Sequence, residues 1–118
     1  MGLSNIDLIV ANPQYPKRSR KVRFLIDTGA MYSVVPRKTL EKIGVVPNNE
    51  QTFSMMDGTP IRRNVGYALF TYEGITRAST VIFGEDGDEP LLGATTLEEM
   101  GLALHPFRRE IRPMLLRI

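Results

Sequence analysis

The chain of 118 residues contains no cysteine and only one histidine, His105. The absence of cysteine excludes disulfide bonds and thiolate metal sites. A Ser-His-Asp or Cys-His mechanism would have to use His105, which lies in a Leu-His-Pro context unlike any nucleophile motif, so we interpret it as structural or solvent-facing. Histidine-rich metal sites lack support for the same reason, and we expect neither a metal nor another cofactor.

Long apolar runs are also missing. No segment approaches the length of a membrane span, and the N-terminus lacks the basic-then-apolar pattern of a signal peptide. We therefore expect no membrane partner and, by default, a cytoplasmic location. A hydrophobic content of 42% and a charged content of 24% are typical of soluble globular proteins, and the length fits one domain without a second lobe.

The chain has little excess of either charge, since its formal net charge is only +2. Basic residues nevertheless gather in two segments. The N-terminal basic segment runs from Lys17 to Arg23. The C-terminal basic segment contains Arg108, Arg109, Arg112 and Arg117. Neither has the interleaved aromatic residues of a single-strand platform, so we interpret them as a solvated loop and a solvated face and expect no nucleic-acid partner. The alternative is nucleic-acid binding through both segments, which would depend on salt concentration.

The most informative segment that is present is Phe24–Ala30, which reads Phe-Leu-Ile-Asp-Thr-Gly-Ala. Apolar residues before Asp27 predict a short buried strand, and Gly29 would permit a tight reversal that a residue with a Cβ resists. A buried carboxylate is costly unless it is hydrogen-bonded or shares its charge, so a fold that keeps one usually uses it. The plainer interpretation is a strand end closed by an ordinary Asp/Gly turn.

Most of the remaining chain is predicted to be extended. Strands are expected at 6–10, before Asp27, and at 51–56, 61–72 and 75–83, with turns at 57–58 and 73–74. The acidic stretch 85–90 lacks the ligand periodicity of a calcium loop and is expected to be a surface loop.

Two short helices are predicted. The first starts near Pro36 and is closed by Gly44. The second is expected to open with a capping box, in which Thr95 or Thr96 pairs with a following glutamate, and to be closed by Gly101.

Two parts of the chain form a degenerate internal repeat. Ile26–Ala30 lines up with Pro90–Ala94, and Thr39–Gly44 lines up with Thr96–Gly101. Each part runs from an apolar strand through a glycine turn to a short helix. We term residues 26–44 the Asp27 copy and residues 90–101 the Leu91 copy. Only the first carries a carboxylate before its glycine turn, since Leu91 takes the place of Asp27.

Together these elements resemble a retropepsin-like aspartic protease, of the single-domain cellular and prokaryotic type related to retroviral proteases. The resemblance is carried by Leu25–Ala30, by a central hairpin around Asp57-Gly58, and by Leu91–Gly93 followed by a helix. It implies a mainly β acid protease fold over residues 1–118, with a closed, barrel-like sheet, one or two short helices and a flap hairpin at about 51–64. It also implies a C2 homodimer.

The resemblance implies an aspartic endopeptidase in which the Asp27 carboxyls of two subunits share a proton and activate water. In this family Thr28 braces the active-site loops across the dimer axis, and Gly29 lets a substrate main chain approach. Ala30 stands where pepsin-like enzymes have a serine donor. We therefore expect the carboxyl pair to hold its proton to higher pH, with an optimum in weakly acidic rather than strongly acidic conditions.

The resemblance also assigns substrate-binding residues and packing residues. The implied substrate is a peptide or an unfolded protein. One of Met55 and Met56 would face it, although core packing is as plausible for either. Ile61 would line the cleft. The flap and packing assignments are completed by Asp57 and Gly58, and by Leu91, Leu92 and Gly93 beneath the catalytic loop.

Two departures from the viral pattern are visible. Met31 and Ala94 stand where viral members usually have an interacting aspartate and arginine, and losing both partners together leaves no unpaired charge. The predicted flap tip, Met56–Pro60, has one glycine and a proline instead of a glycine-rich run, so we expect a stiffer hairpin. This change favours an alternative, in which the dimer keeps the fold but turns over weakly or not at all and serves as a peptide-binding module.

Overall fold

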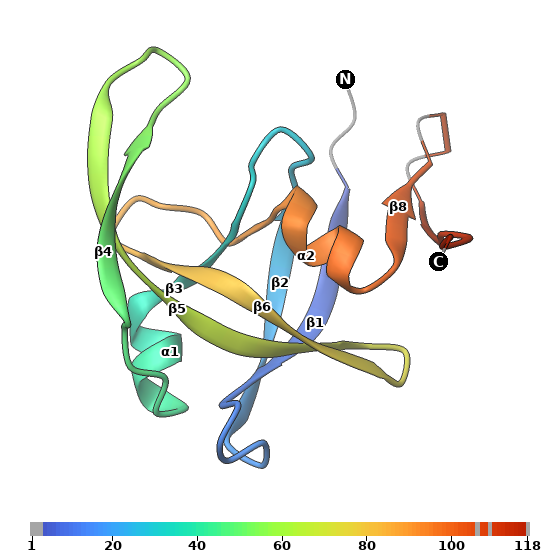
Figure 1. The fold of residues 1–118 in the computed structure, drawn as a ribbon, viewed down its shortest axis with the longest axis horizontal. Coiled ribbons are helices and arrows are strands. Elements are labelled where there is room, and N and C mark those ends of the chain that lie inside the picture. Colours follow the sequence, from blue (N-terminus) through green and yellow to red (C-terminus); the bar gives the residue numbers. More distant parts are fainter. Residues whose placement is uncertain (1–3, 106, 109, 118) are drawn as a thin grey trace.

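The structure is a computed structural model, and it describes residues 4–105, 107–108 and 110–117 (Figure 1). It is mainly β, with two short helices. In chain order the elements are β1 (Asn5–Ala11), β2 (Ser19–Ile26), β3 (Ser33–Pro36), α1 (Arg37–Lys42), β4 (Asn49–Ser54), β5 (Pro60–Tyr72), β6 (Ile75–Gly84), β7 (Leu91–Leu92), α2 (Ala94–Glu99), β8 (Leu102–Leu104) and β9 (Ile111–Pro113).

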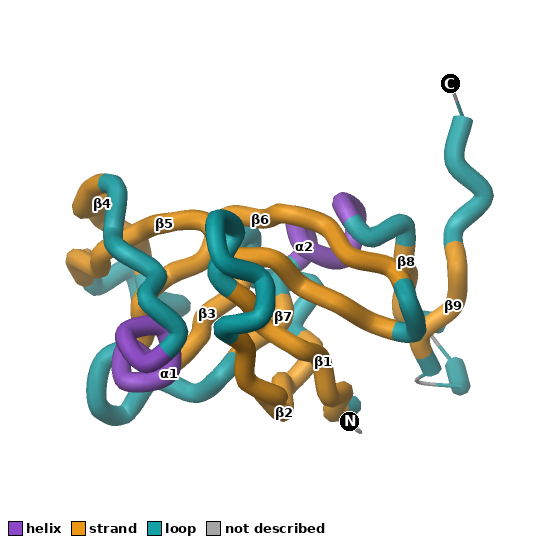
Figure 2. The backbone as a smooth tube through the Cα atoms, turned by 90° about the horizontal axis from the view of Figure 1, so that it is seen from below, coloured by secondary structure: helices purple, strands orange, loops and turns teal. Residues whose placement is uncertain are grey.

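Seven strands form one sheet in the order β1-β2-β7-β3-β6-β5-β4, and β1 also pairs with β5. The pairings therefore link six strands in a circuit, and β4 is attached outside it along β5. The β2–β7 and β3–β6 pairs are parallel, whereas the other pairs in this sheet are antiparallel. Strands β8 and β9 form a separate antiparallel pair at one end of the molecule (Figure 2).

The core lies inside this circuit because the strands alternate between inward apolar and outward polar side chains. Strand β1 shows the pattern clearly, since Ile6, Leu8 and Val10 are buried while the residues between them are exposed. Phe24 of β2 and Phe70 of β5 meet in the core with ring centroids 6.0 Å apart.

Strands occupy most of each predicted range, although β4 spans Asn49–Ser54 instead of 51–56. The N-terminal basic segment is a loop only at Lys17 and Arg18. Residues from Ser19 onward belong to β2, because Val22 and Phe24 are buried on the inner face while Lys21 and Arg23 point outward. Because the basic residues alternate with buried Val22 and Phe24 along β2, their side chains lie on the outer face of the strand.

Both predicted helices exist, and a glycine with positive φ follows each one, with φ of 81° at Gly44 and 68° at Gly101. The predicted capping box is wrong. Helix α2 begins at Ala94 with Gly93 as its N-cap and no side-chain cap hydrogen bond. Thr96 lies inside the helix and is fully buried, and its hydroxyl bonds side chains on two strands.

Each helix has only six residues. Across the described chain, a helix with the length and hydrophobicity needed to cross a bilayer is absent.

Candidate active site

Asp27 directly follows β2, where the preceding residue Ile26 is buried and Asp27 itself is half-buried. Its backbone N–H donates a 3.0 Å hydrogen bond to the carbonyl of Leu92, and its carbonyl accepts a 3.1 Å bond from the N–H of Ala30. The predicted buried strand ending at Asp27 is therefore present. The backbone of Asp27 is held on one side by β7 and on the other by its own turn.

The carboxylate of Asp27 is oriented by Gly29, whose N–H donates a 3.0 Å hydrogen bond to Oδ1. Gly29 is not among the glycines with positive φ, so the reversal itself does not require glycine, contrary to the sequence-based reason. A Cβ at this position would instead lie 3.3 Å from Oδ1, which crowds the carboxylate. Glycine is thus favoured here because of the close approach to Asp27.

Thr28 lies at the exposed tip of the same turn. Its hydroxyl has no hydrogen-bond partner among the residues that the structure describes. This hydroxyl is free to bond a group outside the chain.

The loop after Asp27 is joined to the Leu91 copy by a series of backbone bonds. The N–H groups of Ala94 and Thr95 donate to the carbonyls of Ala30 and Met31 at 2.8 and 2.9 Å. Gly93 fits so closely beneath this loop that a Cβ would lie 2.6 Å from the carbonyl carbon and oxygen of Tyr32. The two loops therefore pack as one unit.

Leu91 and Leu92 lie beside the end of β2, in parallel register with Leu25 and Ile26. Leu92 is fully buried, whereas Leu91 is half-buried. The Leu91 copy thus places apolar side chains next to Asp27 and adds no charge of its own.

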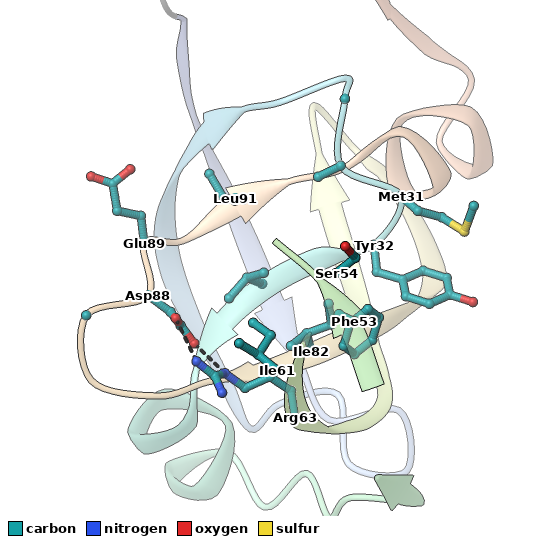
Figure 3. Close-up of a pocket in the computed structure, with 14 residues that line it drawn as sticks. Met31, Tyr32, Phe53, Ser54, Ile61, Arg63, Ile82, Asp88, Glu89 and Leu91 are labelled. Carbon is teal, nitrogen blue, oxygen red and sulfur yellow. Dashed lines mark hydrogen bonds and ion pairs between the residues drawn. The ribbon is translucent and has the colours of Figure 1, made fainter. Parts of the chain in front are cut away.

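A pocket of about 510 Å³ opens beside the turn, with Gly29 and Ala30 in its wall (Figure 3). Tyr32 and Phe53 meet edge to face in it, with ring centroids 6.2 Å apart and planes at 87°. Its apolar lining is formed by Met31, Tyr32, Val34, Phe53, Ile61, Ile82 and Leu91.

The predicted flap residues divide into two groups. Ile61 of β5 lines the pocket, as does its β4 neighbour in register, Phe53. Met55, Met56, Asp57 and Gly58 form the hairpin turn and are not part of the pocket lining. Figure 1 shows this turn and the loop after β2 at the same end of the molecule.

The hairpin turn is held by its own hydrogen bonds. The N–H of Met55 bonds the carbonyl of Thr59 at 2.8 Å, and the N–H of Gly58 bonds the carbonyl of Met55 at 2.9 Å. Asp57 Oδ1 accepts the N–H of Thr59 at 2.9 Å, and this bond lowers the pKa of Asp57. Met56 is fully exposed and Met55 about half-exposed.

One wall of the pocket is an ion pair that sequence reasoning missed. The guanidinium of Arg63 on β5 holds Asp88 through two bonds, of 2.7 Å from Nε and 3.1 Å from Nη2 (Figure 3). Asp88 Oδ2 also accepts the N–H of Glu85 at 2.8 Å. The Arg63 bonds lower the pKa of Asp88 and raise that of Arg63, and both side chains are largely buried.

Some of the site residues that were not predicted carry a signal in the sequence, and others do not. Phe53, Ile61 and Arg63 share one face of a hairpin whose turn was predicted, so two-residue alternation could have added Phe53 and Arg63 to the cleft. Asp88 lies 25 residues from Arg63, and no local pattern signals that pair. The predicted surface loop at 85–90 is exposed apart from Asp88 and Pro90.

The other titratable candidates lie elsewhere. His105 Nδ1 accepts the N–H groups of Phe107 and Arg108, at 3.3 and 3.1 Å, and so closes a turn between β8 and β9. In the C-terminal basic segment, Arg108 and Arg112 pair with Glu110, while Arg109 lies outside the described residues. Within the described ranges, no group of three or more His, Asp or Glu side chains is arranged to hold a metal ion.

The chain is similar to a known protein family and to a solved structure. The family described as "gag-polyprotein putative aspartyl protease" matches residues 18–99, which include the Asp27 turn, the β4–β5 hairpin and α2. Among solved structures, EIAV protease complexed with the inhibitor HBY-793 is similar in fold, with a TM-score of 0.59 and 15% identity over 85% of this chain and 89% of that one. No curated protein sequence matches the chain.

Proposed function

Since the chain belongs to the gag-polyprotein aspartyl protease family and has a retroviral protease fold, we propose that it is an aspartic endopeptidase that acts as a two-fold symmetric homodimer. The observation that carries this proposal is the position of Asp27. Its carboxylate is fixed by the N–H of Gly29 at the end of a buried strand, beside a pocket of about 510 Å³.

The dimer follows from the number of suitable carboxylates. Peptide hydrolysis by this chemistry needs two facing carboxyls, and the chain has one Asp-Thr-Gly turn. The Leu91 copy offers Leu91 and Leu92 at the matching strand end. The second carboxyl would therefore come from Asp27 of another copy across a two-fold axis, and the free hydroxyl of Thr28 would bond the partner's loop.

The proposed reaction uses one proton shared by the two Asp27 carboxyls, because two like charges so close cannot both ionise. The ionised carboxyl takes a proton from water as the water oxygen attacks the peptide carbonyl carbon. The other carboxyl gives its proton to the carbonyl oxygen, which yields a tetrahedral diol. The C–N bond then breaks as the nitrogen receives a proton from the pair, one hydroxyl proton returns to a carboxyl, and no covalent intermediate forms.

In this proposal the whole chain is one domain with a barrel-like sheet, and the β4–β5 hairpin over about 51–64 is the flap. The closed circuit of strand pairings supports the barrel-like description. Phe53 and Ile61 would contact the substrate from the hairpin, and Met55–Gly58 would reach it only when the tip moves over the pocket. Gly29 would leave room for the substrate main chain.

A second candidate function is peptide binding with little or no turnover. It is favoured by the hairpin turn, in which the bond from Thr59 to Asp57 and the following Pro60 restrict the motion that closing would require.

Cleavage of an unfolded protein by the purified chain tests the first proposal. We expect pepstatin-sensitive cleavage that Asp27→Asn abolishes, while the variant keeps the wild-type solution mass and circular dichroism spectrum. Asp86→Asn, which removes an exposed aspartate outside the site, is the matched control and should cleave normally. Undiminished cleavage by Asp27→Asn would reject the mechanism. Substrate binding without cleavage at any pH would instead support the binding module.

A further inference from the structure

Three buried hydroxyl side chains meet behind the Asp27 loop. They belong to Ser33 on β3, Ser79 on β6 and Thr96 on α2, with exposed fractions of 0%, 6% and 0%. Thr96 Oγ1 lies 2.5 Å from Ser33 Oγ and 3.0 Å from Ser79 Oγ. One oxygen therefore joins three elements that are far apart in sequence, and we term these three residues the hydroxyl cluster.

The cluster reaches the backbone of the Leu91 copy through Ser33, whose Oγ accepts the N–H of Gly93 at 2.9 Å. A hydroxyl has one hydrogen to donate, so Thr96 cannot donate to both serines, and at least one serine must donate to it. In the described part of the chain every buried side-chain nitrogen or oxygen has a partner. Removing the Thr96 hydroxyl would leave both buried serines without one of their partners.

The cluster lies next to the bonds that hold the Asp27 loop. Gly93, which Ser33 fixes, is flanked by Leu92, whose carbonyl binds the N–H of Asp27 at 3.0 Å. On its other side, Ala94 and Thr95 bind the loop carbonyls of Ala30 and Met31. Thr96 is the next residue, so its side chain ties this four-residue contact to β3 and β6.

We propose that the hydroxyl cluster, with Thr96 at its centre, positions the Asp27 loop for catalysis by fixing the Leu91 copy beneath it. Thr96 is not among the residues that line the pocket, and its hydroxyl bonds Ser33 and Ser79 instead of the carboxylate, so it is a positioning residue. The inference rests on the proposed protease function, because its effect is read through the geometry of Asp27. A misplacement of about 1 Å in a catalytic group can reduce the rate about 100-fold.

Thr96→Val tests the proposal, because valine keeps the shape of threonine and lacks the hydroxyl. We expect kcat to fall about 10-fold to 100-fold while KM stays within about twofold, since the pocket wall is unchanged. Thr96→Ser, which restores the hydroxyl, should recover most of kcat. Rates must be corrected for the fraction of folded dimer, measured by pepstatin titration of active sites.

The matched control is Thr39→Val. Thr39 is the third residue of α1 as Thr96 is of α2, and its hydroxyl has no partner among the described residues. We expect Thr39→Val to leave kcat and KM at wild-type values. If Thr96→Val retained full kcat per folded dimer, or lost no more than Thr39→Val, the positioning role would be rejected.

Amide hydrogen exchange separates this inference from the proposed function. In Thr96→Val the amides of Asp27, Ala94 and Thr95 should exchange at least about 10-fold faster, while those of the β5–β6 pair stay protected. This comparison works even if the wild-type protein cleaves nothing, an outcome that would reject the protease proposal alone. If Thr96→Val proves insoluble, Ser79→Ala provides the same measurement, with a smaller expected effect because it removes one of the two Thr96 bonds. Unchanged exchange at these three amides would overturn the inference.

Discussion

The Asp27 copy and the Leu91 copy follow the same plan and carry out different tasks. Each has a strand end, a glycine loop, a six-residue helix and a closing glycine with positive φ. In the Asp27 copy the loop is largely exposed and presents a carboxylate. In the Leu91 copy Leu92 and Gly93 are buried, and the helix contributes Thr96 to the core. The comparison teaches that one copy presents a carboxylate and the other supplies the packed support behind it.

The helices show the same contrast. Leu40 of α1 and Leu97 of α2 are both buried, so each helix contributes an apolar anchor. At the third helical position, however, the Thr96 hydroxyl bonds two strands while that of Thr39 has no partner in the described structure. The difference lies in the polar contacts, because only α2 faces the Asp27 loop.

Substitutions at the two strand ends should break the comparison with the largest effect. Leu92→Asp would bury an uncompensated charge at a fully buried position and should destabilise the fold by more than about 3 kcal/mol, or prevent folding. Asp27→Leu should abolish cleavage and change the free energy of unfolding by less than about 1 kcal/mol. Urea unfolding of both variants checks this, and similar stability losses would contradict the division of roles.

The two loop glycines should differ by a smaller amount. Gly93→Ala places a Cβ 2.6 Å from backbone atoms of Tyr32 and should cost about 1–3 kcal/mol in thermal unfolding, because backbone must move. Gly29→Ala meets only the Asp27 carboxylate, at 3.3 Å. It should retain nearly wild-type stability and lose activity. A larger stability loss at Gly29 than at Gly93 would show that the supporting copy has been misidentified.

The segment before β7 is held by an ion pair between Arg63 and Asp88. Since the pKa of Asp88 is lowered in the folded state, the pair stabilises the fold above the ordinary aspartate pKa of 3.8, and this contribution is lost as pH falls through the lower folded value. Asp88→Asn should therefore cost about 1–2 kcal/mol at neutral pH and progressively less below pH 3.8. Unfolding measured as a function of pH tests this, and a cost that grew on acidification would have the wrong sign.

The smallest expected effect concerns the alanine at the same position of each copy. Ala30→Ser would add a hydroxyl donor beside Asp27 and should move the optimum of the pH–rate profile toward acid. Ala94→Ser, the equivalent change in the Leu91 copy, should leave the optimum unchanged. A wild-type profile that already peaks below about pH 3 would contradict the expected role of Ala30.

Sequence patterns predicted those parts of the fold that depend on local chemistry. Enrichment in apolar, β-branched and aromatic residues located most of the strands, although β3 and β8 were not predicted. The glycines after each helix marked its end, because positive φ is a local requirement. The position of Asp27 at a strand end was also predictable. The role of Thr96 was not, because a threonine beside a helix start gives the same local signal whether it caps the helix or bonds distant strands.

Polar contacts between residues far apart in the chain could not be predicted from the sequence either. The Arg63–Asp88 pair joins residues 25 apart, and its geometry depends on how β5 and the loop before β7 are brought together by the sheet. The requirement for glycine at position 29 was predicted, but its cause was not, since only coordinates reveal the approach to the carboxylate.

The placement of β4 outside the strand circuit has a consequence for solubility. Among the described strands β4 pairs only with β5, so its other side is a row of open backbone donors and acceptors on which a foreign chain could polymerise. Nearly all of its side chains are exposed, and Glu50 holds Arg62 of β5 at 2.7 Å. These charges discourage uncontrolled fibre growth along this open edge.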